Sequence, residues 1–149
     1  MNKITGFLIG LVIVGYCQTG TAQPTATFRS TLIKHLDAIT QKNLADIAAT
    51  VADSITLIFP NGEVLKSKQR FVDFHREWFK ENWKMATETI SVSESPTLAN
   101  ALIKYHYREW DANQKLKSES DTYLLLIFRK EKDGWKLFHD QNTKILTKN

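Results

Sequence analysis

The sequence predicts an α+β domain in which helices pack on one face of an antiparallel sheet. The length of 149 residues suits one compact domain. The apolar share of 42% is enough to build a buried core. Most of the expected strands follow the expected helices along the chain, which is typical of the α+β class. The predicted order of elements is α-α-β-β-α-β-β-β-β.

Two helices are expected first. Apolar side chains from Phe28 to Ile39 recur at helical spacing and would share one face of an amphipathic helix. Asn43 is a suitable N-cap for a second, shorter helix over Leu44–Val51. The β-branched and apolar segment Ser54–Pro60 then predicts the first strand.

A hairpin and a third helix follow. The pair Asn61-Gly62 favours a tight two-residue turn, so a short return strand is expected over residues 63–66. Ser67 can cap a third helix, and one face of that helix would carry Phe71, Phe74, His75, Trp78, Phe79 and Asn82. Turn residues then separate four strand-like segments. These segments are Met85–Ser93, Ala99–Trp110, Ser118–Arg129 and Trp135–Ile145.

The N-terminus is typical of an exported protein. Lys3 precedes an apolar run over Phe7–Gly15, and the small residues Gly20 and Ala22 occupy positions −3 and −1 before a cleavage site that follows residue 22. The run is shorter than the roughly 20 residues that span a bilayer. We therefore expect a signal peptide over residues 1–22, a domain over residues 23–149 and a periplasmic or secreted location. After cleavage no stable membrane insertion is expected. A lipoprotein anchored at Cys17 and a retained anchor are the alternatives, and the bulky Tyr16 disfavours the first of them.

Export predicts a defined mature N-terminus. The exported protein should begin at Gln23, either free or cyclised to pyroglutamate, because the cleavage site follows Ala22. Mass spectrometry of exported material checks this. A diacylated Cys17 as the first residue, or an intact Met1, would contradict it.

Several chemistries lack support in the sequence. The net charge of +4 is scattered, which does not favour nucleic-acid binding. The four histidines, His35, His75, His106 and His139, have no metal-ligand spacing. There is no nucleophile motif and no glycine-rich phosphate loop. We therefore expect no metal and no cofactor.

His75 is a polar residue on an otherwise aromatic helix face. It can be a core histidine with one hydrogen bond, or a pocket-lining base that titrates near neutrality. The last expected strand carries His139 and Gln141 on one face and Asp140 and Asn142 on the other. Neither face is purely apolar.

Three segments resemble a known family. The sequences FVDFHREWFKENW, EWDANQ and FRKEKDGWKLFHDQNT are similar to the nuclear transport factor 2-like superfamily. The closest resemblance is to SnoaL-like domains and to the association (hub) domain of calcium/calmodulin-dependent kinase. The resemblance implies a cone-shaped, strongly curved antiparallel sheet wrapped around three helices, with a pocket inside the cone.

The resemblance also implies a site. A histidine and a tryptophan line the hub pocket and correspond to His75 and Trp83, whereas Tyr105, Leu125 and Asn142 stand where the hub has arginines. Inward-facing strand residues would then include Ile103, Tyr107, Ile127 and Asp140. The expected ligand-binding residues are His75, Trp78, Trp83, Tyr105, Tyr107, Tyr123, Leu125, Phe138 and Asn142. The expected catalytic pair is His75 as the base, with Asp140 orienting it.

Assembly is expected as well. The residues that alternate with the inward-facing ones would form the outer face of the sheet, and they are largely apolar. In an antiparallel sheet with one face in water, apolar inward-facing side chains normally alternate with polar outward-facing ones. This set is His106, Trp110, Leu124, Leu126 and Phe128. It predicts a homodimer packed sheet to sheet.

Three functions follow from these expectations. The first is an exported domain that binds a small, mostly apolar ligand in the cone. The second is a cofactor-free proton-transfer enzyme of isomerase, cyclase or dehydratase type. The third is a structural dimerisation module whose pocket is vestigial.

Overall fold

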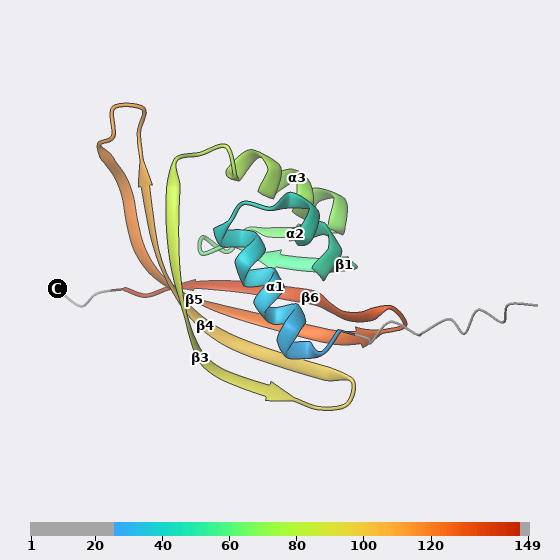
Figure 1. Ribbon diagram of the computed structural model, residues 1–149. Helices are drawn as coiled ribbons and strands as arrows, with labels where there is room; N and C mark the ends of the chain where they lie inside the picture. The colour runs from blue at the N-terminus through green and yellow to red at the C-terminus, as the bar shows by residue number, and fades with distance from the viewer. Residues whose placement is uncertain (1–25, 147–149) are drawn as a thin grey trace, which may run out of the picture.

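Three helices pack on the concave side of one curved, six-stranded sheet (Figure 1). The computed structural model describes residues 26–146, so the expected signal peptide lies outside the described residues. The sheet has the order β2-β1-β6-β5-β4-β3. The helices are α1 (Phe28–Thr40), α2 (Leu44–Thr50) and α3 (Lys68–Trp78). The strands are β1 (Val51–Ile58), β2 (Val64–Lys66), β3 (Trp83–Glu94), β4 (Leu98–Trp110), β5 (Leu116–Glu131) and β6 (Gly134–Lys144).

The predicted fold class and element order are confirmed. All neighbouring strands are antiparallel except β1 and β6, which pair in parallel because the chain crosses the sheet between them. Among residues 26–146 no helix is long and apolar enough to cross a bilayer.

Side-chain caps begin the helices where the sequence places them. The Asn43 side chain accepts a hydrogen bond from the Asp46 backbone N–H, and Ser67 accepts one from Arg70. These caps satisfy backbone donors that have no partner inside the helix. α3 ends at Trp78, earlier than expected, and the chain then turns to begin β3 at Trp83.

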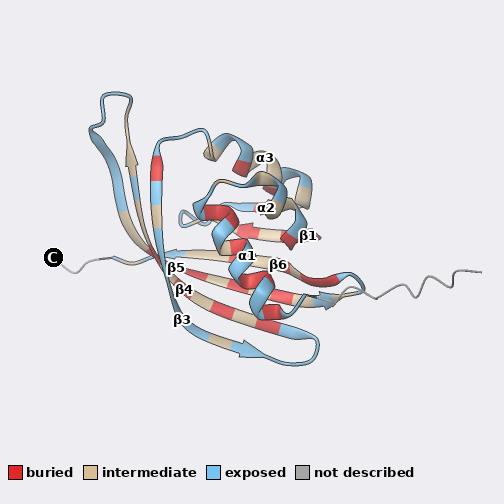
Figure 2. Ribbon diagram, viewed as in Figure 1, coloured by how far each residue is buried: buried red, intermediate tan, exposed pale blue. Residues whose placement is uncertain are grey.

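The inner face of the sheet supplies most of the core (Figure 2). On β4 the side chains of Ala101 and Ile103 are buried, and they pair with Leu126 and Leu124 of β5. Phe28 of α1 closes this layer with its ring centroid 5.3 Å from that of Phe128. The helices are therefore held on the sheet by aromatic packing.

The expected parity of β5 is wrong. Leu124, Leu126 and Phe128, expected on the outer face, are at most 4% exposed and belong to the core. Tyr123 and Leu125, expected inside, lie on the outer face, and Tyr123 is 41% exposed. The segment from Tyr123 to Phe128 is apolar at every position, so its alternation carries no parity signal, and the pairing of Tyr105 with Thr122 sets its register.

A β-bulge displaces Phe138 from the expected inner face. The pairing of β5 with β6 shifts between Ile127 and Phe128, so two residues of β6 face outward in succession. Phe138 packs under Arg129, whose guanidinium carbon lies 5.4 Å from the ring centroid. Beyond the bulge, Asp140 is buried on the inner side.

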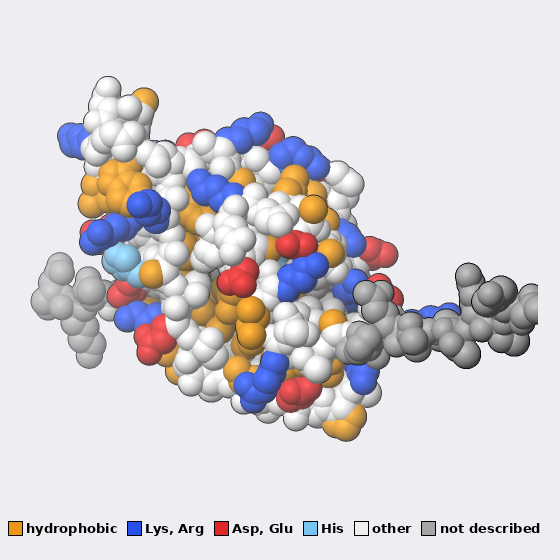
Figure 3. All heavy atoms as spheres, in the orientation of Figure 1, with side chains coloured by type: hydrophobic (Ala, Val, Ile, Leu, Met, Phe, Trp, Pro, Cys, Tyr) orange, Lys and Arg blue, Asp and Glu red, His pale blue; other side chains and the backbone are white. Residues whose placement is uncertain are grey.

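The corrected outer face is still apolar. Its partly exposed apolar side chains are Leu102, Tyr123, Leu125, Ile127 and Phe138. Beside them His106 lies between Asp121 and Glu119, 2.8 and 3.0 Å from their carboxylate oxygens. The β4–β5 hairpin projects past the helices, and Figure 3 shows basic and hydrophobic side chains gathered on it.

Candidate functional site

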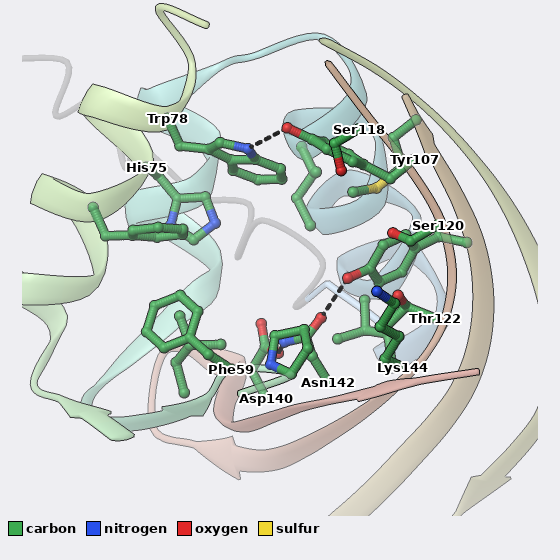
Figure 4. A pocket seen from close by; sticks show the side chains of 17 residues that line it. Phe59, His75, Trp78, Tyr107, Ser118, Ser120, Thr122, Asp140, Asn142 and Lys144 are labelled. Carbon is green, nitrogen blue, oxygen red and sulfur yellow. Dashed lines mark hydrogen bonds between the residues drawn. The ribbon is translucent and has the colours of Figure 1, made fainter. Parts of the chain in front are cut away.

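A cavity of about 320 Å³ lies between α3, the end of β1 and the inner face of the sheet (Figure 4). Its apolar lining comes from both the helix and the sheet. The lining residues are Ile39, Leu57, Phe59, Pro60, Phe74, His75, Trp78, Met85, Tyr105, Tyr107, Ser118, Ser120, Thr122, Leu124, Asp140, Asn142 and Lys144. No cluster of three or more His, Cys, Asp or Glu side chains within the described part could hold a metal ion.

His75 presents a hydrogen-bond acceptor to this cavity. Its Nδ1 lies 2.8 Å from the backbone oxygen of Phe71, one turn earlier in α3. A carbonyl oxygen only accepts, so Nδ1 carries the proton and Nε2 keeps a free lone pair. Figure 4 shows a ring nitrogen of His75 directed into the cavity. Burial lowers the pKa of His75 to about 4, so the imidazole is neutral at physiological pH.

Phe71, not Asp140, fixes the tautomer of His75. The expected base–orienter pair is therefore wrong in this respect, because a carbonyl within the same helix already occupies Nδ1. His75 and Asp140 nevertheless line the same cavity. They face it from different elements, α3 and β6.

Asp140 presents a carboxyl group. Burial raises its pKa to about 7, so it is protonated in mildly acidic solution. Its Oδ1 accepts a hydrogen bond from Asn142 Nδ2 at 2.9 Å. Asn142 in turn accepts one from the Tyr105 hydroxyl at 3.0 Å and donates to the Ile58 carbonyl at 3.2 Å. This chain fixes Asp140 while leaving its Oδ2 available to a ligand.

The upper wall is aromatic. Trp78 Nε1 donates to the Tyr107 hydroxyl at 3.3 Å, and that hydroxyl donates to Glu109 at 3.0 Å. Burial raises the pKa of Tyr107 to about 12, so the hydroxyl stays neutral. Trp83 lies behind this wall: it stacks on Trp78 with ring centroids 4.3 Å apart and donates to the Trp78 carbonyl.

The structure brings together only part of the expected site. His75, Trp78, Tyr105, Tyr107, Asp140 and Asn142 line the cavity, Trp83 supports it, and Tyr123, Leu125 and Phe138 lie on the other side of the sheet. Sequence reasoning missed Ser118, Ser120, Thr122 and Lys144. The alternation of the three hydroxyls at positions 118, 120 and 122 is the signal that could have found them.

A second buried histidine lies outside the cavity lining. His35 Nδ1 is 2.8 Å from Thr50 Oγ1, and its Nε2 is buried with no partner among the described residues. Burial lowers the pKa of His35 to about 3. His35 and His75 are thus both neutral imidazoles in the folded protein.

These groups predict a defined pH dependence of stability. The folded pKa values of His35 and His75 lie below the ordinary value of 6.5, so each group destabilises the fold as the pH falls from about 6.5 to 4. The folded pKa of Asp140 is raised from 3.8 to about 7, so in this window the folded protein binds a proton at this carboxyl group that the unfolded chain does not bind. This proton offsets the effect of one of the two histidines. The free energy of unfolding should therefore fall by roughly 1 kcal/mol per pH unit in this window.

Denaturant titrations at pH 6.5, 5.5 and 4.5 measure this slope. Asp140→Asn should roughly double the slope, because it removes the proton that only the folded protein binds. His75→Phe should bring the slope near zero, because it removes one of the two protons that only the unfolded chain binds. A stability that rises on acidification of the wild-type protein would contradict these assignments.

The family can now be stated from comparison with known proteins. The family model of the SnoaL-like domain matches residues 29–143 of this chain. No curated protein matches the chain. A ketosteroid isomerase-like protein from Erwinia carotovora is a similar solved structure. It has 19% identity and a TM-score of 0.69, and the match covers 80% of this chain and 94% of that one.

Two further solved structures share the fold. A proposed calcium/calmodulin-dependent protein kinase type II association domain from Thiobacillus denitrificans has 13% identity and a TM-score of 0.67, over 82% of this chain and 98% of that one. A proposed dehydratase of the NTF2-like family from Streptomyces avermitilis has 13% identity and a TM-score of 0.66, over 78% and 92%. The chain belongs to the SnoaL-like domain family, and it shares its fold with the NTF2-like structure.

Proposed function

We propose that this protein binds a small, mostly apolar molecule in the inner cavity. The volume of about 320 Å³ lies within the range of roughly 300–1,000 Å³ that is usual for small-molecule sites. Phe59, Phe74 and Trp78 give the ligand flat apolar surfaces to pack against. The cavity therefore suits a compact ring system.

The observation that carries the proposal is a pair of unengaged polar atoms at this apolar site. Within the described residues, neither His75 Nε2 nor Asp140 Oδ2 has a hydrogen-bond partner, although both side chains are buried. Both atoms are accessible from the cavity, since the one fully buried side-chain atom without a partner among the described residues is His35 Nε2. They can therefore form hydrogen bonds to a bound molecule. A ligand with one donor and one acceptor would satisfy both atoms.

A neutral aromatic probe tests this proposal. 2-Naphthol should raise the melting temperature of the wild-type protein and bind saturably in calorimetry. Ser120→Trp should abolish binding because Ser120 lines the cavity, and Ser91→Trp on the exposed face of β3 should not. Equal binding to both variants, or no saturable binding to the wild type, would overturn the proposal.

A second candidate is cofactor-free proton transfer. It is favoured by one observation: a neutral imidazole and a protonated carboxyl group face the same cavity. His75 Nε2 would take a proton from a carbon next to a carbonyl group. The Asp140 hydroxyl would donate a hydrogen bond to the carbonyl oxygen as negative charge develops there. The similar structures named as isomerase-like and dehydratase proteins are compatible with such chemistry.

Deuterium exchange separates binding from catalysis. In D₂O, the wild-type protein should accelerate exchange of the α-protons of 2-indanone, followed by proton NMR, and His75→Phe should not. Binding without accelerated exchange would reduce the function to ligand binding.

Export and self-association complete the proposal. The N-terminal sequence features support a periplasmic or secreted location. The apolar outer face around Leu125 supports a homodimer packed sheet to sheet, and the name of the similar association domain is in keeping with assembly. A protein that forms the dimer but binds no ligand would support the third hypothesis, a structural dimerisation module.

A further inference from the structure

A single basic side chain lies at the cavity. Among the described lining residues Lys144, near the end of β6, is the one lysine or arginine. It is exposed, and no ion pair joins it to a described acidic side chain. By contrast, Lys117, next to the lining residue Ser118 in β5, is paired with Glu109.

A stripe of hydroxyl groups leads to Lys144. Ser118, Ser120 and Thr122 occupy alternate positions of β5 and line the same cavity. Thr122 is the cross-strand partner of Lys144. Figure 4 shows these four side chains along one wall, opposite the aromatic rings of α3. No described residue hydrogen-bonds to the hydroxyl of Ser118 or Ser120.

The cavity is thus polarised along its length. Its buried end carries Asp140, which is 5% exposed and has no basic partner among its described contacts. Its open end carries the ammonium group of Lys144 with free hydroxyl donors. An anion at the buried end would lose its hydration without compensation, whereas at the open end it keeps water and gains a cation.

We infer that the ligand is a small organic acid with an apolar ring, whose carboxylate is bound by Lys144 and the hydroxyls of Ser118 and Ser120. This rests on the proposed function and adds its substrate class. The ring packs between Phe59, Phe74 and Trp78. The carboxylate remains partly in water at the mouth, so the contribution of Lys144 is modest and salt-dependent.

Three indoles of similar shape and different charge test the inference. Indole-3-acetate, indole-3-acetamide and tryptamine are titrated calorimetrically at pH 6, where Asp140 is protonated. In 50 mM salt the acid should bind about 5-fold more tightly than the amide, and the amine most weakly. In 500 mM salt the advantage of the acid should shrink.

Matched variants identify the group responsible. Lys144→Met, which keeps the aliphatic stem, should bring the acid to the affinity of the amide and leave the amide unchanged. Lys130→Met is the control, because Lys130 is exposed near the opposite end of β5. If the acid and the amide bind equally tightly to the wild type, the inference is overturned. If Ser120→Trp also prevents both from binding, the proposed ligand site in the cavity remains supported. Failure of all three probes to bind would count against the proposed function itself.

Discussion

Phe128→Glu is expected to abolish folding. The Phe128 ring is fully buried against Phe28 and the edge of His35. Removing such a ring costs about 3–5 kcal/mol, and burying a carboxylate without a partner adds several more. This approaches or exceeds the total stability of about 5–15 kcal/mol that is usual for a domain. Circular dichroism should show no cooperative thermal transition.

The neighbouring outer-face position provides the contrast. Leu125→Glu changes a half-buried side chain on the other side of the same strand, so the fold should survive. If the outer face forms the homodimer, this variant should be monomeric by light scattering at micromolar concentration while the wild type is dimeric. A folded Phe128→Glu protein would contradict the register of β5, and a monomeric wild type would contradict the dimer.

His75→Phe is expected to remove ligand binding with little loss of stability. Phenylalanine keeps the approximate volume of the imidazole among the rings of Phe71, Phe74 and Phe79. The Phe71 carbonyl retains its intrahelical hydrogen bond when Nδ1 is lost. The free energy of unfolding at pH 7 should change by no more than about 1.5 kcal/mol. Binding of 2-naphthol should fall below detection because the acceptor Nε2 is gone.

The matched control is His35→Phe. It is the same substitution at another fully buried histidine that does not line the cavity. This variant should bind 2-naphthol as the wild type does. Chemical denaturation and calorimetry on both variants separate the two roles. A His75→Phe protein that is strongly destabilised yet binds normally would make His75 a structural residue only.

The order of elements could be predicted because each boundary carries a local signal. Asn43 and Ser67 are side-chain caps, and a hairpin turn lies between β1 and β2 as expected. The turn is a three-residue loop over residues 60–62, not the expected two-residue Asn61-Gly62 turn, because Gly62 alone has a positive φ there. The facing of β5 could not be predicted, because six successive apolar residues fit either face. Only the cross-strand pairing with β4, a contact between distant segments, determines it.

The site was predictable where a polar residue interrupts an apolar face. His75 among the aromatic residues of α3 and Asn142 on β6 stand out in this way. The bulge that turns Phe138 outward depends on the pairing of β5 and β6, and has no local sequence signal. The tautomer of His75 likewise depends on hydrogen-bond geometry at the Phe71 carbonyl, which residue type alone does not determine.

A crystal structure of the protein with bound 2-naphthol tests the central claim most directly. The naphthalene ring should lie between the sheet and the rings of Phe74 and Trp78. Its hydroxyl group should lie within hydrogen-bond distance of His75 Nε2. A cavity that contains only ordered water, with the probe bound elsewhere or absent at saturating concentration, would contradict it.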